Sequence, residues 1–302
     1  MSDDLFWTYP LRLKINEDGK TVCDLLGEYK HFLEANKPER FNSFNQLCHT
    51  QPEAARAEAV VFAFFKWNGY EIQVEETRNG GGVDFRAQKD NIEFVIEVTS
   101  ILRETFTRRS GVPENPWASG RSVHVADYEV ARQIRHKAFA KANQMSGYDC
   151  PTILMIACEH IEFSTYLKKS EEVGFGAEMF LTSPQVLGLL NLDDVTYLDD
   201  ALFVKFQENG RIVFCRESIS AVLLFYISKY HVEATGLLHS KPAHKFSIEL
   251  LPSVPFVKAL IPERVLTSKT KDYSVGDFDN QIGARWIPDN LPDGSFIYNQ
   301  WC

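Results

Sequence analysis

The chain has 302 residues, 44% of them hydrophobic and 13% aromatic, so it can bury a large core, which excludes a disordered protein. Its formal net charge of −9 at pH 7 argues against a protein that coats nucleic acid non-specifically. No apolar run approaches the roughly 20 residues of a membrane span, and the acidic N-terminus lacks the parts of a signal peptide, so we expect a cytoplasmic protein without membrane association.

Two helices are predicted in the first part of the chain. Residues 1–50 are expected to form a helical or mixed cap, with a helix around residues 22–36. A second helix over residues 53–67 ends at Asn68-Gly69, because a glycine at this place is typical of a helix C-terminus. No residue pattern in the cap points to chemistry.

The second helix carries a carboxylate on its apolar face. Glu58 shares that face with three large apolar residues at helical spacing, Val61, Phe62 and Phe65. Because the apolar face of a helix packs on the core, we expect Glu58 to point toward the sheet.

A triple glycine at residues 80–82 introduces two predicted strands that each carry an acid. Asp84 opens the first strand, and a polar turn leads into an apolar strand over residues 94–101 that has Glu97 inside it. A glutamate is rarely buried without a partner, so Glu97 indicates a site rather than plain core. The hairpin would bring the two carboxylates together, and converging carboxylates are typical ligands of a hard divalent cation.

Structural alternatives for the two acids stay open. Asp84 could cap the turn that follows the glycines. Glu97 could form a buried ion pair with Arg86 or Arg103. In that case the acids would belong to an internal salt-bridge network, in a protein unrelated to nucleic acid.

The segments after the second strand define the fold class. A long polar loop is predicted over residues 103–125, a helix over residues 127–145 and a buried strand over residues 151–157. Loops of this length are uncommon without a function of their own. The order of two strands, loop, helix and strand predicts an α/β fold, with a central mixed β-sheet flanked by helices and its core at residues 51–160.

The last part of the chain, residues 161–302, is expected to form an α+β extension packed on this core. Its predicted elements are a helical or irregular segment at 163–175, a hairpin of 201–206 and 211–215, a strand at 221–228 and a wrapping tail from residue 252. We find no internal repeat, so a repeat architecture is not expected.

The segment from Arg103 to Lys141 is basic, although the whole chain is acidic. It holds eight basic and four acidic residues, which gives it a net charge of +4. A local basic patch on an acidic body can contact phosphates. The residues predicted to bind nucleic acid are Arg103, Arg108, Arg109, Arg121 and Lys141.

Three short motifs occur in order over about residues 53–158: Glu58 in the first helix of the core, Gly82-Val83-Asp84-Phe85, and Ile96-Glu97-Val98-Thr99. This arrangement resembles the PD-(D/E)XK nuclease superfamily, which has a restriction-endonuclease-like fold. The resemblance implies hydrolysis of phosphodiester bonds with Mg²⁺, or Mn²⁺, held by Asp84, Glu97 and the carbonyl of Val98, and with Glu58 nearby through water. It also implies a homodimer.

The chain departs from the motif of that superfamily at Thr99, which stands where the family has a lysine. A hydroxyl cannot supply the positive charge that would stabilise the phosphate as it reacts. The following helix offers a polar stripe of Gln133, Lys137, Lys141 and Gln144. Lys137 is our first choice for the relocated lysine, with Gln133 in support; the solvated edge of an amphipathic helix is the alternative.

The sequence therefore predicts a Mg²⁺-dependent endonuclease, and DNA is favoured over RNA as its substrate. The alternative is a nuclease-fold subunit that has lost turnover and binds nucleic acid or assembles with partners. Other sites are poorly supported: the six cysteines form no Cys-x-x-Cys pair, His239 and His244 lack further zinc ligands, and the glycines lack the Lys-Ser/Thr ending of a P-loop.

Overall fold

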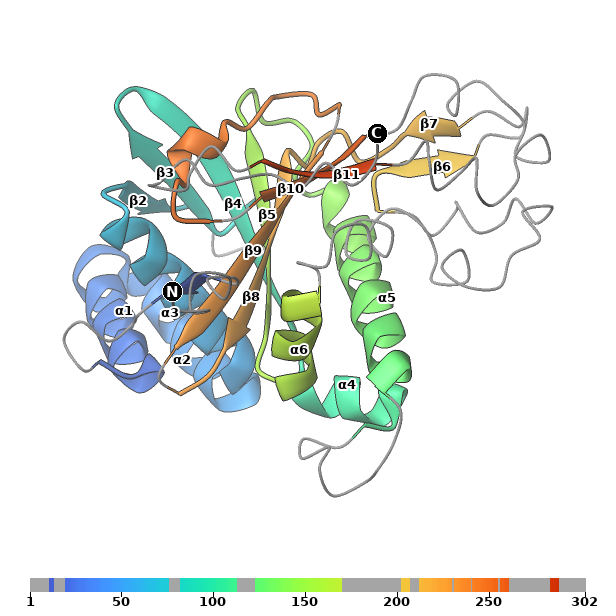
Figure 1. Cartoon of the computed structure of the whole chain (residues 1–302). Coiled ribbons are helices and arrows are strands. Elements are labelled where there is room, and N and C mark those ends of the chain that lie inside the picture. Colours follow the sequence, from blue (N-terminus) through green and yellow to red (C-terminus); the bar gives the residue numbers. More distant parts are fainter. Residues whose placement is uncertain are drawn as a thin grey trace, which may run out of the picture.

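The computed structural model has a central β-sheet with helices on both faces (Figure 1). The residues that the structure describes are 11–13, 20–75, 82–112, 123–169, 202–206, 212–229, 231–239, 241–254, 256–260 and 283–287. The α/β class, with a mixed central sheet flanked by helices, is therefore confirmed.

In the described part of the chain, nine strands form the central sheet. They are β1 (Leu11–Leu13), β2 (Glu71–Val74), β3 (Phe85–Lys89), β4 (Ile92–Ile101), β5 (Thr152–Cys158), β8 (Ala221–Ile227), β9 (Val232–Leu238), β10 (Phe256–Leu260) and β11 (Gly283–Ile287). The order across the sheet is β11, β10, β9, β8, β5, β4, β3 and β2, and β1 pairs with β9. Strands β4, β5 and β8 are parallel neighbours. Strand β3 runs antiparallel to β4, and β9 runs antiparallel to β8, so the sheet is mixed.

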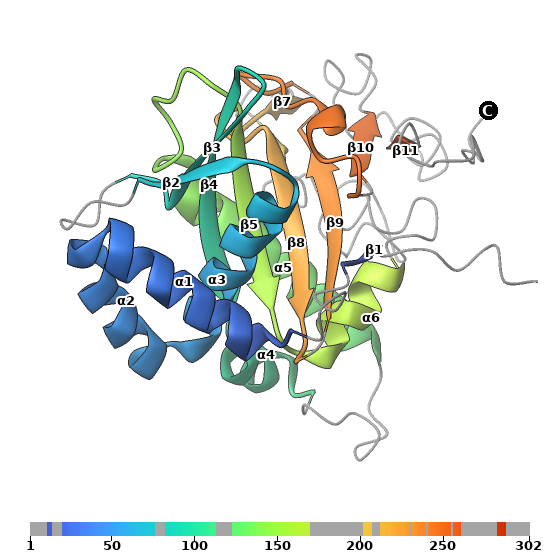
Figure 2. The same ribbon diagram turned by 90° about the vertical axis from the view of Figure 1, so that its left-hand side faces the viewer.

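The helices lie in two groups, one on each face of the sheet (Figures 1 and 2). The first group is α1 (Val22–Asn36), α2 (Pro38–Thr50) and α3 (Pro52–Trp67), and the second is α4 (Arg103–Ser110), α5 (Val123–Ala142) and α6 (Ile161–Lys169). Helix α3 packs on β4 and β5 from one side, and α5 packs on the same strands from the other.

Side-chain alternation along the strands produces two cores. Strand β5 is buried throughout: Ile153 and Met155 belong to the core under α1 and α3, and Leu154 and Ile156 belong to the core under α5. This is expected for a strand covered by helices on both faces. On β4 the same alternation turns Val95 to the side of α5, and Glu97, two residues on, shares that side.

Local signals explain where the first three helices begin and end. Thr21 and Asp24 form a capping box at the start of α1. Proline occupies the first position of α2 and α3, where its missing N–H costs no hydrogen bond. Gly69 follows α3 with φ +80, a conformation that glycine adopts readily. The predicted helices at 22–36 and 53–67 are confirmed, and α2 was not predicted as a separate helix.

The predicted loop over residues 103–125 is wrong in its first part, because α4 occupies residues 103–110. The backbone N–H of Arg103 donates to Glu53 Oε2 at 2.9 Å, so a carboxylate of α3 caps α4. Phe106 is buried, and Gly111 ends the helix in the left-handed conformation. A cap supplied by another element leaves no local pattern in the sequence. Residues 113–122, including Arg121, lie outside the described part.

The later elements lie near their predicted positions, although the helix predicted over residues 127–145 ends at Ala142. Helix α5 begins at Val123, four residues before the predicted start. The predicted hairpin is present as β6 (Val204–Phe206) paired with β7 (Ile212–Phe214), and the strand at 221–228 is β8. The described parts of the tail, β10 and β11, extend the central sheet. None of the described helices is both long enough and apolar enough to cross a membrane.

His239 follows β9 and is buried in its neutral form. Its Nε2 lies 2.9 Å from the carbonyl oxygen of Cys215, and its Nδ1 accepts the backbone N–H of Lys241 at 2.9 Å. The ring packs on Phe203, with 4.5 Å between the ring centroids. Burial lowers the pKa of His239 to about 4, against the effect of the bond to Cys215, and the nearby Arg216 lowers it as well.

We therefore expect acid to destabilise the protein through His239. The pKa is lower in the folded than in the unfolded state, so the unfolded state takes up the proton first as the pH falls. The contribution is complete above about pH 6.5 and is lost toward about pH 4, on the order of 3 kcal/mol over that window. Urea denaturation at neutral and acidic pH measures how much free energy of unfolding is lost on acidification. This loss should be smaller in His239→Gln than in the wild type. In His49→Gln, which replaces an exposed histidine, it should equal that of the wild type. An identical loss in His239→Gln would contradict this.

Candidate active site

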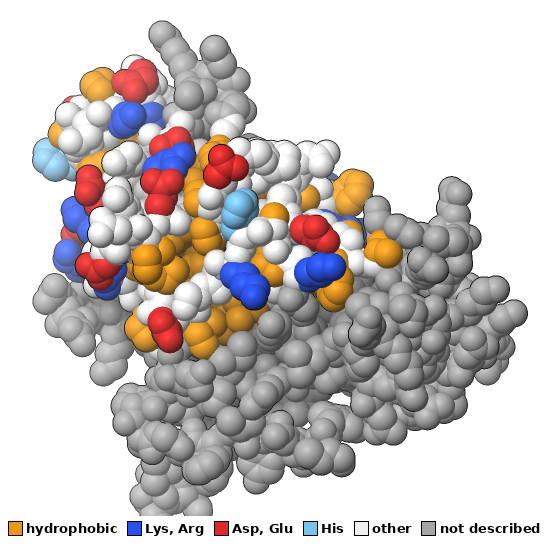
Figure 3. Space-filling view, turned by 90° about the horizontal axis from the view of Figure 1, so that it is seen from above, with side chains coloured by type: hydrophobic (Ala, Val, Ile, Leu, Met, Phe, Trp, Pro, Cys, Tyr) orange, Lys and Arg blue, Asp and Glu red, His pale blue; other side chains and the backbone are white. Residues whose placement is uncertain are grey.

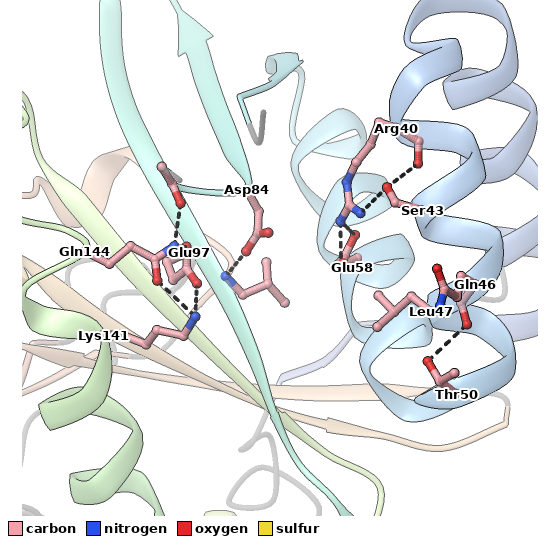
Figure 4. Close-up of a pocket in the computed structure, with 12 residues that line it drawn as sticks. Arg40, Ser43, Gln46, Leu47, Thr50, Glu58, Asp84, Glu97, Lys141 and Gln144 are labelled. Carbon is pink, nitrogen blue, oxygen red and sulfur yellow. Dashed lines mark hydrogen bonds and ion pairs between the residues drawn. The ribbon is translucent and has the colours of Figure 1, made fainter. Parts of the chain in front are cut away.

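A pocket of about 360 Å³ lies between α2, the C-terminal end of α5 and the strands β3 and β4 (Figure 4). Three acids and two bases line it, together with polar side chains and Leu47. The charged residues are Arg40, Glu58, Asp84, Glu97 and Lys141. The three acids of the sequence motifs are thus brought into one pocket.

The pairing of β3 with β4 places Asp84 beside Glu97. Phe85 lies opposite Ile96 in the antiparallel register, and the backbone N–H of Asp84 donates to the carbonyl of Ile96 at 3.1 Å. The carboxylate of Asp84 reaches across to β4, where its Oδ2 accepts the backbone N–H of Val98 at 2.6 Å. Gly82, with φ +103, lets the chain turn into the strand at this point.

Glu97 is buried, and its partners come from the last turn of α5 and from the turn that follows it. Its side chain is 2% exposed, and Lys141 Nζ lies 2.6 Å from its Oε1. Gln144 Nε2 donates to Glu97 Oε2 at 2.9 Å and also to the carbonyl of Gly82. These contacts satisfy the need of a buried carboxylate for a charged partner. Gln144 also ties the β4 carboxylate to the segment that leads into Asp84.

Glu58 lines the pocket from α3, and it is paired with a base of α2. Arg40 Nη2 lies 3.2 Å from Glu58 Oε1 and 3.0 Å from Oε2. Arg40 Nη1 donates to Ser43 Oγ at 3.0 Å. Both ion-pair side chains are only 10% exposed. The guanidinium therefore holds a defined position on the wall formed by α2.

Three residues of the predicted catalytic set do not line this pocket: Lys137, Gln133, and Thr99 at the lysine position of the motif. Lys137 lies one turn before Lys141 on α5, and its pKa is lowered by burial first and then by the neighbouring charges of Lys141 and Arg109. Gln133 is buried and donates to Glu129. Thr99 stands on β4 beyond the lining residues. Lys141, which the sequence assigned to nucleic-acid binding, is the lysine beside the acids.

The basic residues of α4 divide into two kinds. Arg103 is engaged with Glu53, its Nε lying 3.4 Å from Glu53 Oε1, and with Glu159. Arg108 and Arg109 are exposed, and Arg109 is close enough to Lys137 to affect its pKa. On the described part of the face in Figure 3, basic side chains are interspersed with acidic ones, in keeping with the acidic whole chain.

The donor chemistry of the pocket fits Mg²⁺ better than zinc. Among the described residues, no group of three or more His, Cys, Asp or Glu side chains is placed to hold a metal ion. Mg²⁺ needs fewer, because it commonly binds one or two carboxylates and completes its shell with water and phosphate oxygens. Asp84 and Glu97 provide two such carboxylates. Val98 also lines the pocket, with its N–H directed at Asp84.

Among the lining residues that the sequence did not assign to the site, Gln144 and Arg40 are the two whose side chains contact its acids. Gln144 belongs to the predicted polar stripe of α5, three residues after Lys141, so a weak signal for it existed. Arg40 carried no signal, because it lies outside the three motifs and reaches Glu58 only through the packing of α2 on α3.

No protein-family model, curated protein or solved structure matches this chain. The α/β class by itself does not decide a function, since similar architectures support unrelated activities. The side chains of the pocket therefore carry the functional inference.

Proposed function

We propose that this protein is a Mg²⁺-dependent nuclease that hydrolyses phosphodiester bonds in DNA, with Mn²⁺ as a substitute ion. In this proposal it is a PD-(D/E)XK enzyme in which Lys141 takes the place of the missing lysine of the motif. Asp84 and Glu97 hold the metal, and the homodimer expected from the resemblance belongs to the same proposal. The bound ion would activate a water molecule and neutralise charge on the phosphate.

The observation that carries the proposal is the contact between Lys141 and Glu97 in a pocket that also contains Asp84. Lys141 Nζ lies 2.6 Å from Glu97 Oε1. An ammonium group at this place puts a positive charge beside the position where negative charge develops on the phosphate. The charge that Thr99 cannot provide from β4 thus comes from the last turn of α5.

The other residues of the pocket orient these groups. Gln144 holds Glu97 through its Oε2 and contacts the carbonyl of Gly82 as well. The backbone N–H of Val98 holds Asp84 Oδ2. With both carboxylates fixed by hydrogen bonds, little reorganisation remains when substrate binds, which favours catalysis.

A binding protein without turnover is the second candidate, and the ion pairs of the pocket favour it. Glu97 is paired with Lys141, and Glu58 is paired with Arg40. Acids held in this way can serve structure alone, as in a nuclease-fold subunit that binds nucleic acid or assembles with partners.

Cleavage assays separate the two candidates. The purified chain is incubated with supercoiled plasmid and with linear DNA in Mg²⁺, in Mn²⁺ and in EDTA. The nuclease proposal expects nicked and shortened DNA with either metal and intact DNA in EDTA. DNA that stays intact under all conditions, while a gel-shift assay shows binding, would leave the second candidate.

A further inference from the structure

Two pairs of opposite charge face each other across the pocket. Lys141 and Glu97 form one pair, Arg40 and Glu58 form the other, and Asp84 lies between them (Figure 4). The proposed metal chemistry uses the first pair. It assigns no role to Arg40, the base that lines the pocket from α2.

A contribution to the stability of the fold is a weak explanation for the ion pair between Arg40 and Glu58. Removing two charges from water costs free energy that their attraction often fails to recover, so a buried ion pair is poor evidence of stabilisation. Arg40 and Glu58 are nevertheless both 10% exposed and line a polar pocket rather than a sealed core. A guanidinium also matches the geometry of phosphate oxygens better than any other side chain.

The wall formed by α2 is polar except at Leu47. Ser43, Gln46 and Thr50 follow Arg40 at steps of three or four residues, about one turn each, and all of them line the pocket. Such a wall offers hydrogen-bonding groups to an extended polar ligand that lies along the helix. Its single charged group is Arg40, because the other three side chains are neutral.

We propose that Arg40 binds a phosphate group of the nucleic-acid strand from the side opposite Lys141, and that Glu58 is its positioning residue. The inference rests on the proposed function for the identity of the ligand. Glu58 and Ser43 hold the guanidinium at the wall before the strand arrives, which reduces the ordering cost of binding. Glu58 then acts through Arg40 and not as a metal-associated acid.

The salt dependence of binding tests this role. A fluorescein-labelled oligothymidylate is titrated with the protein in Ca²⁺ over a range of salt concentrations, and a gel checks that the strand stays intact. Loss of one phosphate contact lowers the slope of log K against log salt by about 0.7 for a single strand. Arg40→Gln should show this decrease and bind about tenfold more weakly at low salt, as expected for loss of a charge-assisted hydrogen bond.

Two further variants make the test specific. Arg40→Gln leaves Glu58 without its base, so the double variant Arg40→Gln/Glu58→Gln, which removes both charges, is measured as well and should lose the same slope. Arg56→Gln is the matched control, because Arg56 also pairs with a glutamate, Glu159, but outside the pocket. It should keep the slope of the wild type.

The outcomes separate this inference from the proposed function. If the wild type cleaves DNA but the Arg40 variants keep its slope and affinity, the inference is wrong and the nuclease proposal stands. If the wild type does not cleave but the Arg40 variants lose the slope, the inference stands and the nuclease proposal fails. An equal loss of slope in Arg56→Gln would also overturn the inference, since the effect would not belong to the pocket.

Discussion

Replacing Asp84 with asparagine is expected to reduce Mg²⁺-dependent cleavage of DNA by about 10³-fold or more. The asparagine keeps an oxygen that can accept the N–H of Val98, so the pairing of β3 with β4 should persist. It loses the charge that the metal needs, and several kcal/mol of transition-state stabilisation correspond to a change of this size. The initial rate of plasmid nicking measures the effect, and titration calorimetry with Mn²⁺ measures the loss of metal affinity.

Asp90→Asn is the matched control for this experiment. Asp90 is exposed at the turn between β3 and β4, where φ is +51, and asparagine tolerates this conformation. The control changes the same residue type on the same hairpin and should keep the wild-type rate. An Asp84→Asn variant that cleaves as fast as the wild type would show that Asp84 does not hold the metal.

Replacing Lys141 with glutamine is expected to lower kcat by about 10²- to 10³-fold, the usual cost of removing one group that stabilises transition-state charge. The same change at Lys137 should leave kcat nearly unchanged, since Lys137 does not line the pocket. The two lysines are one helical turn apart on α5, so each variant is the control for the other. Initial rates at saturating DNA measure the difference.

Lys141→Gln should also destabilise the fold, by about 3 kcal/mol, because it leaves Glu97 buried without its ammonium partner. Circular dichroism must therefore confirm that the variant is folded at the assay temperature. Lys141→Arg keeps the positive charge and should recover stability more than activity, because a guanidinium has a different shape from an ammonium. A loss of kcat in Lys137→Gln, with normal kcat in Lys141→Gln, would return the role to Lys137, as the sequence predicted.

The acids of the site were predictable because local chain geometry controls them. A hairpin with a short turn fixes its own register, so Asp84 before one strand and Glu97 inside the next had to come close. The periodicity of α3 placed Glu58 on the same face as Phe62 and Phe65, among its buried residues, for an equally local reason. Each of these expectations depends on neighbours within a few residues or on one hairpin.

The bases of the site were not predictable in the same way. Which turn of α5 meets Glu97 depends on where that helix crosses the sheet, and the polar stripe contains both Lys141 and Lys137, the first choice from the sequence. Arg40 reaches Glu58 from a helix that precedes the motifs. Helix α4 likewise forms under a cap that Glu53 supplies from α3.

The sequence by itself therefore determined the α/β class, the adjacency of Asp84 and Glu97 and the helix face on which Glu58 lies, because hydrophobic periodicity and hairpin register act over short stretches of chain. Only the tertiary structure decided that Lys141 rather than Lys137 contacts Glu97, and that Arg40 pairs with Glu58. Both contacts depend on how whole helices pack on the sheet and on each other. That packing is settled by the fit of side chains over the entire interface, which no single segment encodes.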